Sequence, residues 1–310
     1  MFFSKKFIKI LSILFLLSFF LLVLIQPKES RVYASYGLML WFDKMIPTLY
    51  PFMVLSQIML QSGIAYYLSN ILYFFSGRIY SISVYALFVI IMGFLSGFPM
   101  GAILISSLLQ KKYISKEEGE YLLAFCNNLG PVFVIGFVYP LCPILSIQQI
   151  LFVVYGIPLI FGLFLRYTKY RHLQFHTPNV SKHTCNFSFI NILENVLNPC
   201  LISIARLGGL MILFNSFQVY FSNNLYQING KVHAILSLLL EITGGVEIAS
   251  SFPELFPFVY VILPFGGLCC LAQTSIIMKK HDFSIALYLL NKGIQCIASA
   301  LFLLFFYSIS

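Results

Sequence analysis

Charged residues are scarce in this sequence. Asp, Glu, Lys and Arg make up 9% of its 310 residues, whereas soluble domains carry roughly 25%. Hydrophobic residues make up 60%, and the mean hydropathy is +0.91. This composition excludes a soluble domain and predicts an all-α polytopic membrane protein. The net charge of +9 comes from cations in short loops beside apolar runs. That is the positive-inside distribution of membrane proteins, so we expect no nucleic-acid partner.

Several signatures of catalysis are also missing from the sequence. It contains no CxxC pair, no histidine partner at metal-binding spacing, no Walker motif, no dinucleotide fingerprint and no nucleophile–base pair. We therefore expect no enzyme activity, no metal and no cofactor. Most cysteines lie in apolar sequence, where small packing residues are the simplest interpretation; these are Cys126, Cys142, Cys200, Cys269, Cys270 and Cys296.

The apolar runs and basic loops divide the chain into four parts. Residues 1–35 are expected to hold an N-terminal membrane helix acting as a signal-anchor, because the run 7–25 is long for a cleaved signal peptide. The alternative is a signal peptide that is cleaved at residues 32–34. The other parts are a first half (36–165), a basic cytoplasmic loop (166–186) and a second half (187–310).

Two helix breaks are expected in the first half. If residues 80–110 formed a single helix, that helix would be about 46 Å long, which is too long for a hydrocarbon core of about 30 Å. The stretch also contains Pro99 between two glycines, so a re-entrant hairpin fits better. Ser115 is expected to cap the next helix with Glu118 three residues on. That helix breaks again at residues 127–131.

The second half repeats this plan. Residues 196–224 parallel residues 42–70, and breaks follow at 241–245 and 264–267. The first copy would run from outside to inside and the second from inside to outside. The sequence therefore predicts an inverted repeat with discontinuous, re-entrant helices, an arrangement in which transporters place a midplane site.

The residues at the breaks are the candidate ligand-binding residues. Asn127 and Asn128 suit a neutral polar ligand, or they cap broken helix ends. Glu241 is an ionisable group in apolar sequence; it binds a ligand, cation or proton, or it forms a structural ion pair with Arg206. Gln273 binds the ligand or bonds between helices. The full set is Ser96, Gly97, Pro99, Gly101, Asn127, Asn128, Gly130, Glu241, Thr243, Gly244, Gly266, Gly267 and Gln273.

These motifs resemble those of the nucleoside-recognition, or Gate, domain family, and within it a sporulation membrane protein. The residues that carry the resemblance are 96–102, 114–118, 123–128, 130–131, 135–136, 240–243, 245, 265–267 and 273. The resemblance covers about residues 41–280. Phe98 stands where the family usually has tyrosine, and the stretch after Gly130 is bulkier than usual. The resemblance implies two Gate-like halves in a multi-pass protein of the bacterial cell membrane, needed for the spore envelope or cortex, with nucleoside-like ligands.

The leading hypothesis is a transporter-like or channel-like permease for a small polar solute bound between the broken helices. The alternative is a non-transporting scaffold or assembly factor for spore cortex formation. A pore subunit that works with a partner is a third possibility. The composition requires one partner, the lipid bilayer. A homo-oligomer and a sporulation membrane partner are further possibilities.

Overall fold

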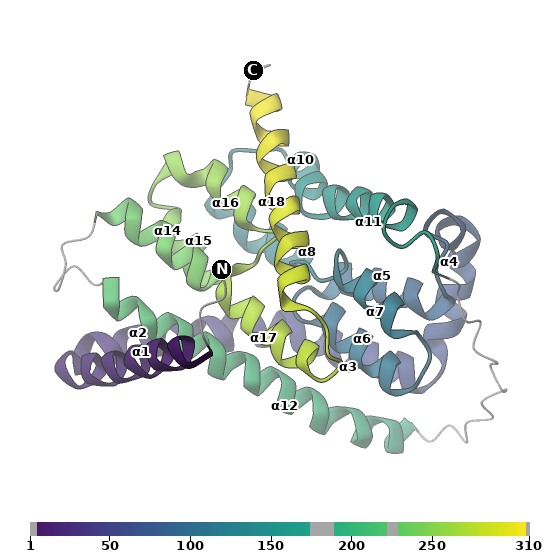
Figure 1. Ribbon diagram of the computed structural model, residues 1–310, viewed down its shortest axis with the longest axis horizontal. Coiled ribbons are helices and arrows are strands. Elements are labelled where there is room, and N and C mark those ends of the chain that lie inside the picture. The colour runs from purple at the N-terminus through teal and green to yellow at the C-terminus, as the bar shows by residue number, and fades with distance from the viewer. Residues whose placement is uncertain (1–4, 174–188, 222–228, 308–310) are drawn as a thin grey trace.

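The computed structural model describes residues 5–173, 189–221 and 229–307, and every regular element within them is a helix (Figure 1). Five stretches of helix are long and apolar enough to cross a membrane: Pro27–Gln61, Ile147–Tyr167, Phe189–Phe221, Pro253–Lys279 and Ile285–Phe306. Together with shorter apolar helices, these spans confirm the prediction of an all-α, polytopic membrane protein.

The N-terminal part of the chain forms two antiparallel arms. The first is α1 (Lys5–Ile25); the second joins α2 (Pro27–Leu40), the π-helical turn η1 (Trp41–Met45) and α3 (Ile46–Gln61) into one continuous rod. The expected boundary at residue 35 therefore falls inside α2. Pro27 lies in the first turn of α2, where a missing N–H is tolerated best, whereas Pro47 lies inside the rod, just after the π-helical turn η1.

The first helix break lies where the sequence predicts it. After α4 (Ile64–Tyr80), α5 (Val84–Ser96) ends at Gly97, and α6 (Met100–Gln110) starts after Pro99. Gly97 has φ of +86°, a backbone conformation that favours glycine. The α5 and α6 helices pack against each other on either side of this turn. Gly93 and Gly101 lie side by side across this turn, and a Cβ on Gly93 would be in ordinary contact with the Gly101 Cα but would clash with the Cys126 carbonyl oxygen.

The second break separates α7 (Lys116–Leu123) from α8 (Pro131–Phe133), which continues through η2 (Val134–Val138) into α9 (Tyr139–Leu141). The α7 helix ends four residues earlier than residue 127. Ser115 caps it as predicted, accepting from the Glu118 N–H at 3.1 Å. The Glu118 carboxyl turns elsewhere and accepts from the Ser83 N–H at 2.9 Å, so it joins the starts of α7 and α5.

The first half closes with α10 (Ile147–Leu151), η3 (Phe152–Gly156) and α11 (Ile157–Tyr167). Arg166, expected in the basic loop 166–186, instead belongs to the last turn of α11 and is buried. Its guanidinium donates to the carbonyls of Tyr80, Ser81 and Tyr170, because bare carbonyls at helix ends need donors. Residues 174–186 of the predicted loop lie outside the described residues.

The second half begins with α12 (Phe189–Ser216) and η4 (Phe217–Phe221), which pack along α2 and α3. Trp41 lies over Gly208 and donates from Nε1 to the Ile204 carbonyl at 2.9 Å. The remaining elements are α14 (Gly230–Leu240), α15 (Ile242–Ala249), η5 (Pro253–Leu255), α16 (Phe256–Ile262), α17 (Gly267–Lys279) and α18 (Ile285–Tyr307). Breaks therefore separate α14 from α15 and α16 from α17, close to the predicted positions.

Candidate functional site

The two breaks of the first half touch each other. A Cβ placed on Gly97 would clash with the Gly130 backbone nitrogen, and a Cβ on Gly101 would lie 2.6 Å from the Cys126 carbonyl oxygen. The contacts are backbone against backbone, a distance that only glycine permits. The turn between α5 and α6 is therefore seated directly on the turn between α7 and α8.

The breaks of the second half join this contact. A Cβ on Gly267 would lie 3.2 Å from the Leu238 carbonyl oxygen and 3.3 Å from the Ile242 nitrogen, which places the α16–α17 turn on the α14–α15 turn. A Cβ on Gly266 would lie 2.9 Å from the Phe98 ring. Phe98 and Gly266 therefore bring the breaks of the two halves together.

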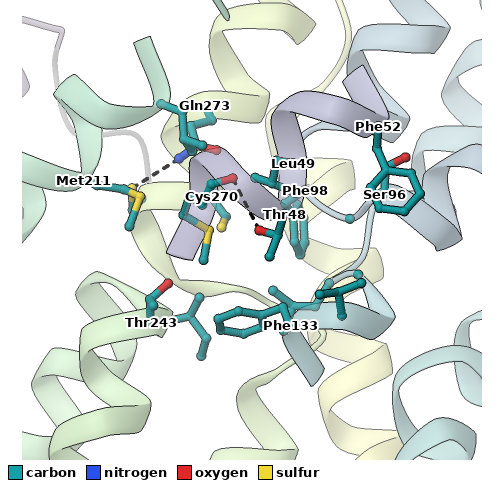
Figure 2. A pocket seen from close by; sticks show the side chains of 18 of the residues that line it. Thr48, Leu49, Phe52, Ser96, Phe98, Phe133, Met211, Thr243, Cys270 and Gln273 are labelled. Carbon is teal, nitrogen blue, oxygen red and sulfur yellow. Dashed lines mark hydrogen bonds between the residues drawn. The ribbon is translucent and has the colours of Figure 1, made fainter. Parts of the chain in front are cut away.

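A central pocket opens where the breaks meet (Figure 2). Its volume is about 40 Å³, enough for roughly three water molecules. The walls are mainly apolar and include Leu49, Phe98 and Phe133. Two buried polar atoms of lining residues, the Ser96 Oγ and the Gln273 Oε1, have no hydrogen-bond partner among the described residues. Such atoms are the natural places for water or a ligand to bond.

Glu241 lies in the wall of this pocket and is 2% exposed. It caps α15: its carboxyl oxygens accept from the Thr243 N–H at 3.0 Å and the Gly244 N–H at 2.8 Å. The Asn215 side chain donates to the same carboxyl at 3.3 Å. Donors on a buried helix N-terminus stabilise an acidic group, so the fold can hold Glu241 away from water.

The predicted ion pair between Arg206 and Glu241 does not form. Arg206 is exposed on α12 and lines a different cavity, while the Glu241 carboxyl is occupied by α15 amides and Asn215. The ion pair found among the described residues joins Lys231 to Glu254, at 3.0 Å on the surface. Arg206 does belong to the same half of the chain as Glu241, but sequence spacing does not show which face of α12 the Arg206 side chain occupies.

Behind Glu241 lies a buried polar chain that the sequence analysis missed. Asn215 accepts from the Gln218 amide at 2.8 Å, and Gln218 accepts from the Ser237 hydroxyl at 3.3 Å. The three residues are fully buried. Asn215 on α12 and Gln218 on η4 are three residues apart, and this spacing was visible in the sequence as two polar positions on one face of an apolar helix, whereas Ser237 comes from α14.

The asparagines of the second break face the second half. The Asn127 amide donates to Thr274 Oγ1 at 3.0 Å and to the Tyr288 hydroxyl at 3.1 Å. Its Oδ1 has no partner among the described residues. Asn128 donates to the Phe125 carbonyl at 2.6 Å, which is the capping role weighed above. Neither asparagine belongs to the lining of the central pocket.

Lys292 is the most unexpected residue of the site. It lies in α18 with 0% of its surface exposed. Its ammonium donates to the Asn127 carbonyl and, at 2.9 Å, to Asn128 Oδ1, and a weaker contact at 3.4 Å reaches Gln295 Oε1. The Phe98 ring centroid is 5.2 Å away. A buried cation is costly unless it is bonded, so Lys292 ties α18 to the second break.

The structure therefore separates the predicted site residues into two groups. Those that line the central pocket are Ser96, Gly97, Gly130, Glu241, Thr243 and Gln273. Those that shape or support the breaks from outside its lining are Pro99, Gly101, Asn127, Asn128, Gly244, Gly266 and Gly267. Within the described residues, no cluster of three or more His, Cys, Asp or Glu side chains is placed to hold a metal ion.

Comparison with known proteins gives one informative similarity. No family model matches the chain, and no solved structure matches it. The Gate-domain resemblance therefore stays a prediction. The chain is 27% identical over 333 residues to the sporulation integral membrane protein YlbJ of Bacillus subtilis (strain 168), covering 94% of this chain and 82% of that protein. This similarity and the apolar helices support a multi-pass membrane protein in sporulation, and the chain is assigned as YlbJ-like.

Proposed function

We propose that this chain is a permease of a sporulation membrane, which binds a small polar solute between the broken helices of its two halves. The observation that carries the proposal is the meeting of the breaks around one pocket with the buried Glu241 in its wall. Interrupted helices whose ends converge at membrane depth are the usual construction of a transporter site. Backbone that leaves a helix in lipid requires protein, water or ligand partners.

The order of elements supports an inverted repeat. With α4 of the first half left aside, each half has a long leading helix, two interrupted helices and a closing helix: α2–α3, α5–α6, α7–α9 and α10–α11, then α12, α14–α15, α16–α17 and α18. If α2–α3, α7–α9 and α10–α11 each cross the membrane once and α5–α6 is a hairpin, the second copy enters from the side opposite to the first. Relative movement of two such halves gives alternating access in known transporter classes.

The chemistry of the pocket suits a neutral or hydroxyl-bearing solute. Ser96 Oγ can donate or accept a hydrogen bond, Gln273 Oε1 accepts, and Glu241 accepts from any donor that replaces Asn215. A cavity of about 40 Å³ is far smaller than typical ligand pockets of roughly 300–1,000 Å³. Solute binding therefore requires the halves to part, as alternating access does. No catalytic step is proposed.

Uptake into proteoliposomes tests this function. Wild-type protein, Glu241→Gln and Asn127→Ala would be compared for entry of radiolabelled uridine, ribose and glycine against protein-free liposomes. Glu254→Gln is the matched control, because Glu254 is an exposed carboxylate in the same half. We expect saturable entry of at least one solute, lowered at least tenfold by Glu241→Gln and unchanged by the control. Entry no faster than into protein-free liposomes, or equal flux from all variants, would remove the proposal.

The small central cavity favours one other candidate, a non-transporting scaffold for spore cortex assembly that works with membrane partners or as an oligomer. In a scaffold the breaks serve helix packing alone, and the pocket stays dry. Thiol labelling of single cysteines placed at Asn128 and Gln273 separates the two candidates. A permease exposes these positions to water in part of its cycle, whereas a scaffold protects them throughout.

A further inference from the structure

Two larger cavities lie beside the central pocket. The first, of about 180 Å³, lies between α6, α12 and α17, and Ser106, Ser203 and Arg206 are among its walls. The second, of about 230 Å³, lies between α3, α6 and the start of α12, and its walls include Gln57 and Asn195. Each is several times larger than the central pocket of about 40 Å³.

The three cavities form a series with shared walls. Ser107 and Gln110 line both of the larger cavities. Gln273 and Leu207 line both the cavity of about 180 Å³ and the central pocket. The second cavity therefore adjoins the first, the first adjoins the central pocket, and Gln273 stands in the wall between the last two.

The walls of the two larger cavities are polar in a way that lipid does not tolerate. The hydroxyls of Ser107 and Ser203 donate to carbonyls of their own helices. Amides and cations in contact with hydrocarbon are costly, and such groups at membrane depth line water-filled cavities or contact protein. The described lining residues include the cations Lys111, Arg206 and Lys280, and no acidic side chain. Two of these cations are exposed at helix ends, Lys111 after α6 and Lys280 after α17.

Charge also gives the side of the membrane. Lys111 and Lys280 lie in the short loops that carry many of the chain's lysines, and such loops remain in the cytoplasm. We propose that the two larger cavities form a water-filled vestibule open to the cytoplasm, with Gln273 as the residue that a solute passes on its way to the central pocket. The vestibule deepens the proposed function, on which the solute's passage rests.

Thiol labelling tests the vestibule without reference to any solute. The parent is Cys185→Ser, because Cys185 lies in the basic loop, outside the described residues. The test variants add Ser203→Cys or Ser107→Cys, near-isosteric changes at vestibule walls. The matched control adds Ile202→Cys, the neighbouring position on α12, which is 52% exposed on the apolar surface. The reagent is a membrane-impermeant methanethiosulfonate carrying a sulfonate group.

In inside-out membrane vesicles we expect Ser203→Cys and Ser107→Cys to react at least tenfold faster than Ile202→Cys, because thiols ionise and react in water but not in lipid. In right-side-out vesicles the vestibule variants should react no faster than the control. Equal rates for test and control variants, or faster labelling from outside, would overturn the vestibule. Fast labelling without solute uptake would leave the vestibule standing and remove only the permease. Solute uptake without fast labelling would remove the vestibule and leave the permease standing.

Discussion

Substituting Gly101 by alanine tests the packing of one break on another. The added Cβ would lie 2.6 Å from the Cys126 carbonyl oxygen, and both positions are backbone, so no side chain can move aside. Overpacking of this kind costs about 1–3 kcal/mol. Replacing glycine by alanine inside a helix contributes about 0.5–1 kcal/mol in the opposite direction. Because Gly101 is the second residue of α6, this gain is at most that large, and we expect a net loss of about 0–3 kcal/mol in the free energy of unfolding.

Gly209→Ala is the matched control. Gly209 is also inside a helix, α12, and no described atom outside that helix lies within 4 Å of its added Cβ. Gly101 is the second residue of α6 and gains no more helix propensity than Gly209 in the interior of α12, so the difference between the two variants is the steric contact, about 1–3 kcal/mol, plus up to about 1 kcal/mol. The assay is the midpoint of thermal unfolding in detergent, where about 1 kcal/mol shifts the midpoint by roughly 2–4 °C. Equal midpoints for Gly101→Ala and Gly209→Ala would refute the contact between the breaks.

Three further predictions use the same unfolding assay. Glu241→Ala leaves two buried backbone N–H groups without an acceptor and removes one of the two acceptors of the Asn215 amide, so it should cost about 2–5 kcal/mol, whereas Glu254→Ala, in the exposed pair, should leave the midpoint unchanged. Burial and nearby lysines lower the pKa of His281 in the folded chain, so as pH falls the unfolded chain binds a proton at this position before the folded chain does. The free energy of unfolding of the wild type should therefore fall as pH drops through about 6.5. It should fall more steeply than that of His281→Asn, which lacks the titrating group. Gly208→Ala places a Cβ 2.5 Å from the Trp41 ring and should lower the midpoint, and Trp41→Leu in the same chain should restore part of the loss.

The helix breaks were predictable from the sequence because their physical causes are local. Proline and a glycine held at positive φ interrupt a helix whatever surrounds them, and a carboxyl group in an apolar run can cap the helix that follows a break. Gly97, Pro99, Glu241 and Gly266 were found for that reason, and the structure breaks at all of them. The exact ends were less predictable: α7 stops at Leu123 because the turn must fit under Gly101.

The role of Lys292 was not predicted, although a signal for it exists. The α18 helix has a mean hydropathy of 1.7 and was interpreted as a plain span. Tyr288, Lys292, Gln295 and Ser299 follow one another at helical spacing along one face, and all four are buried. Which break this face contacts depends on tertiary packing between residues more than 160 positions apart, and no local pattern contains that information.

The same limit explains why the partners of Arg166 and Arg206 were not predicted correctly. Both were placed by their neighbours in the sequence, one in a basic loop and the other beside Glu241. Arg166 instead donates to helix-end carbonyls of another segment, and Arg206 faces the vestibule. A single cation in an apolar helix indicates a polar environment but does not identify its partner.

The account depends most on the contact between the two halves, and a double-mutant cycle between Lys292 and Asn128 measures it most directly. Lys292 comes from the last helix of the second half and bonds Asn128 Oδ1 in the first half at 2.9 Å. The variants are Lys292→Met, Asn128→Leu and both together, compared by free energy of unfolding. Removing both partners should cost less than the sum of the single losses, with a coupling energy of about 1–3 kcal/mol. Losses that add within about 0.3 kcal/mol would show that α18 of the second half does not contact the second break of the first half, and would contradict the account.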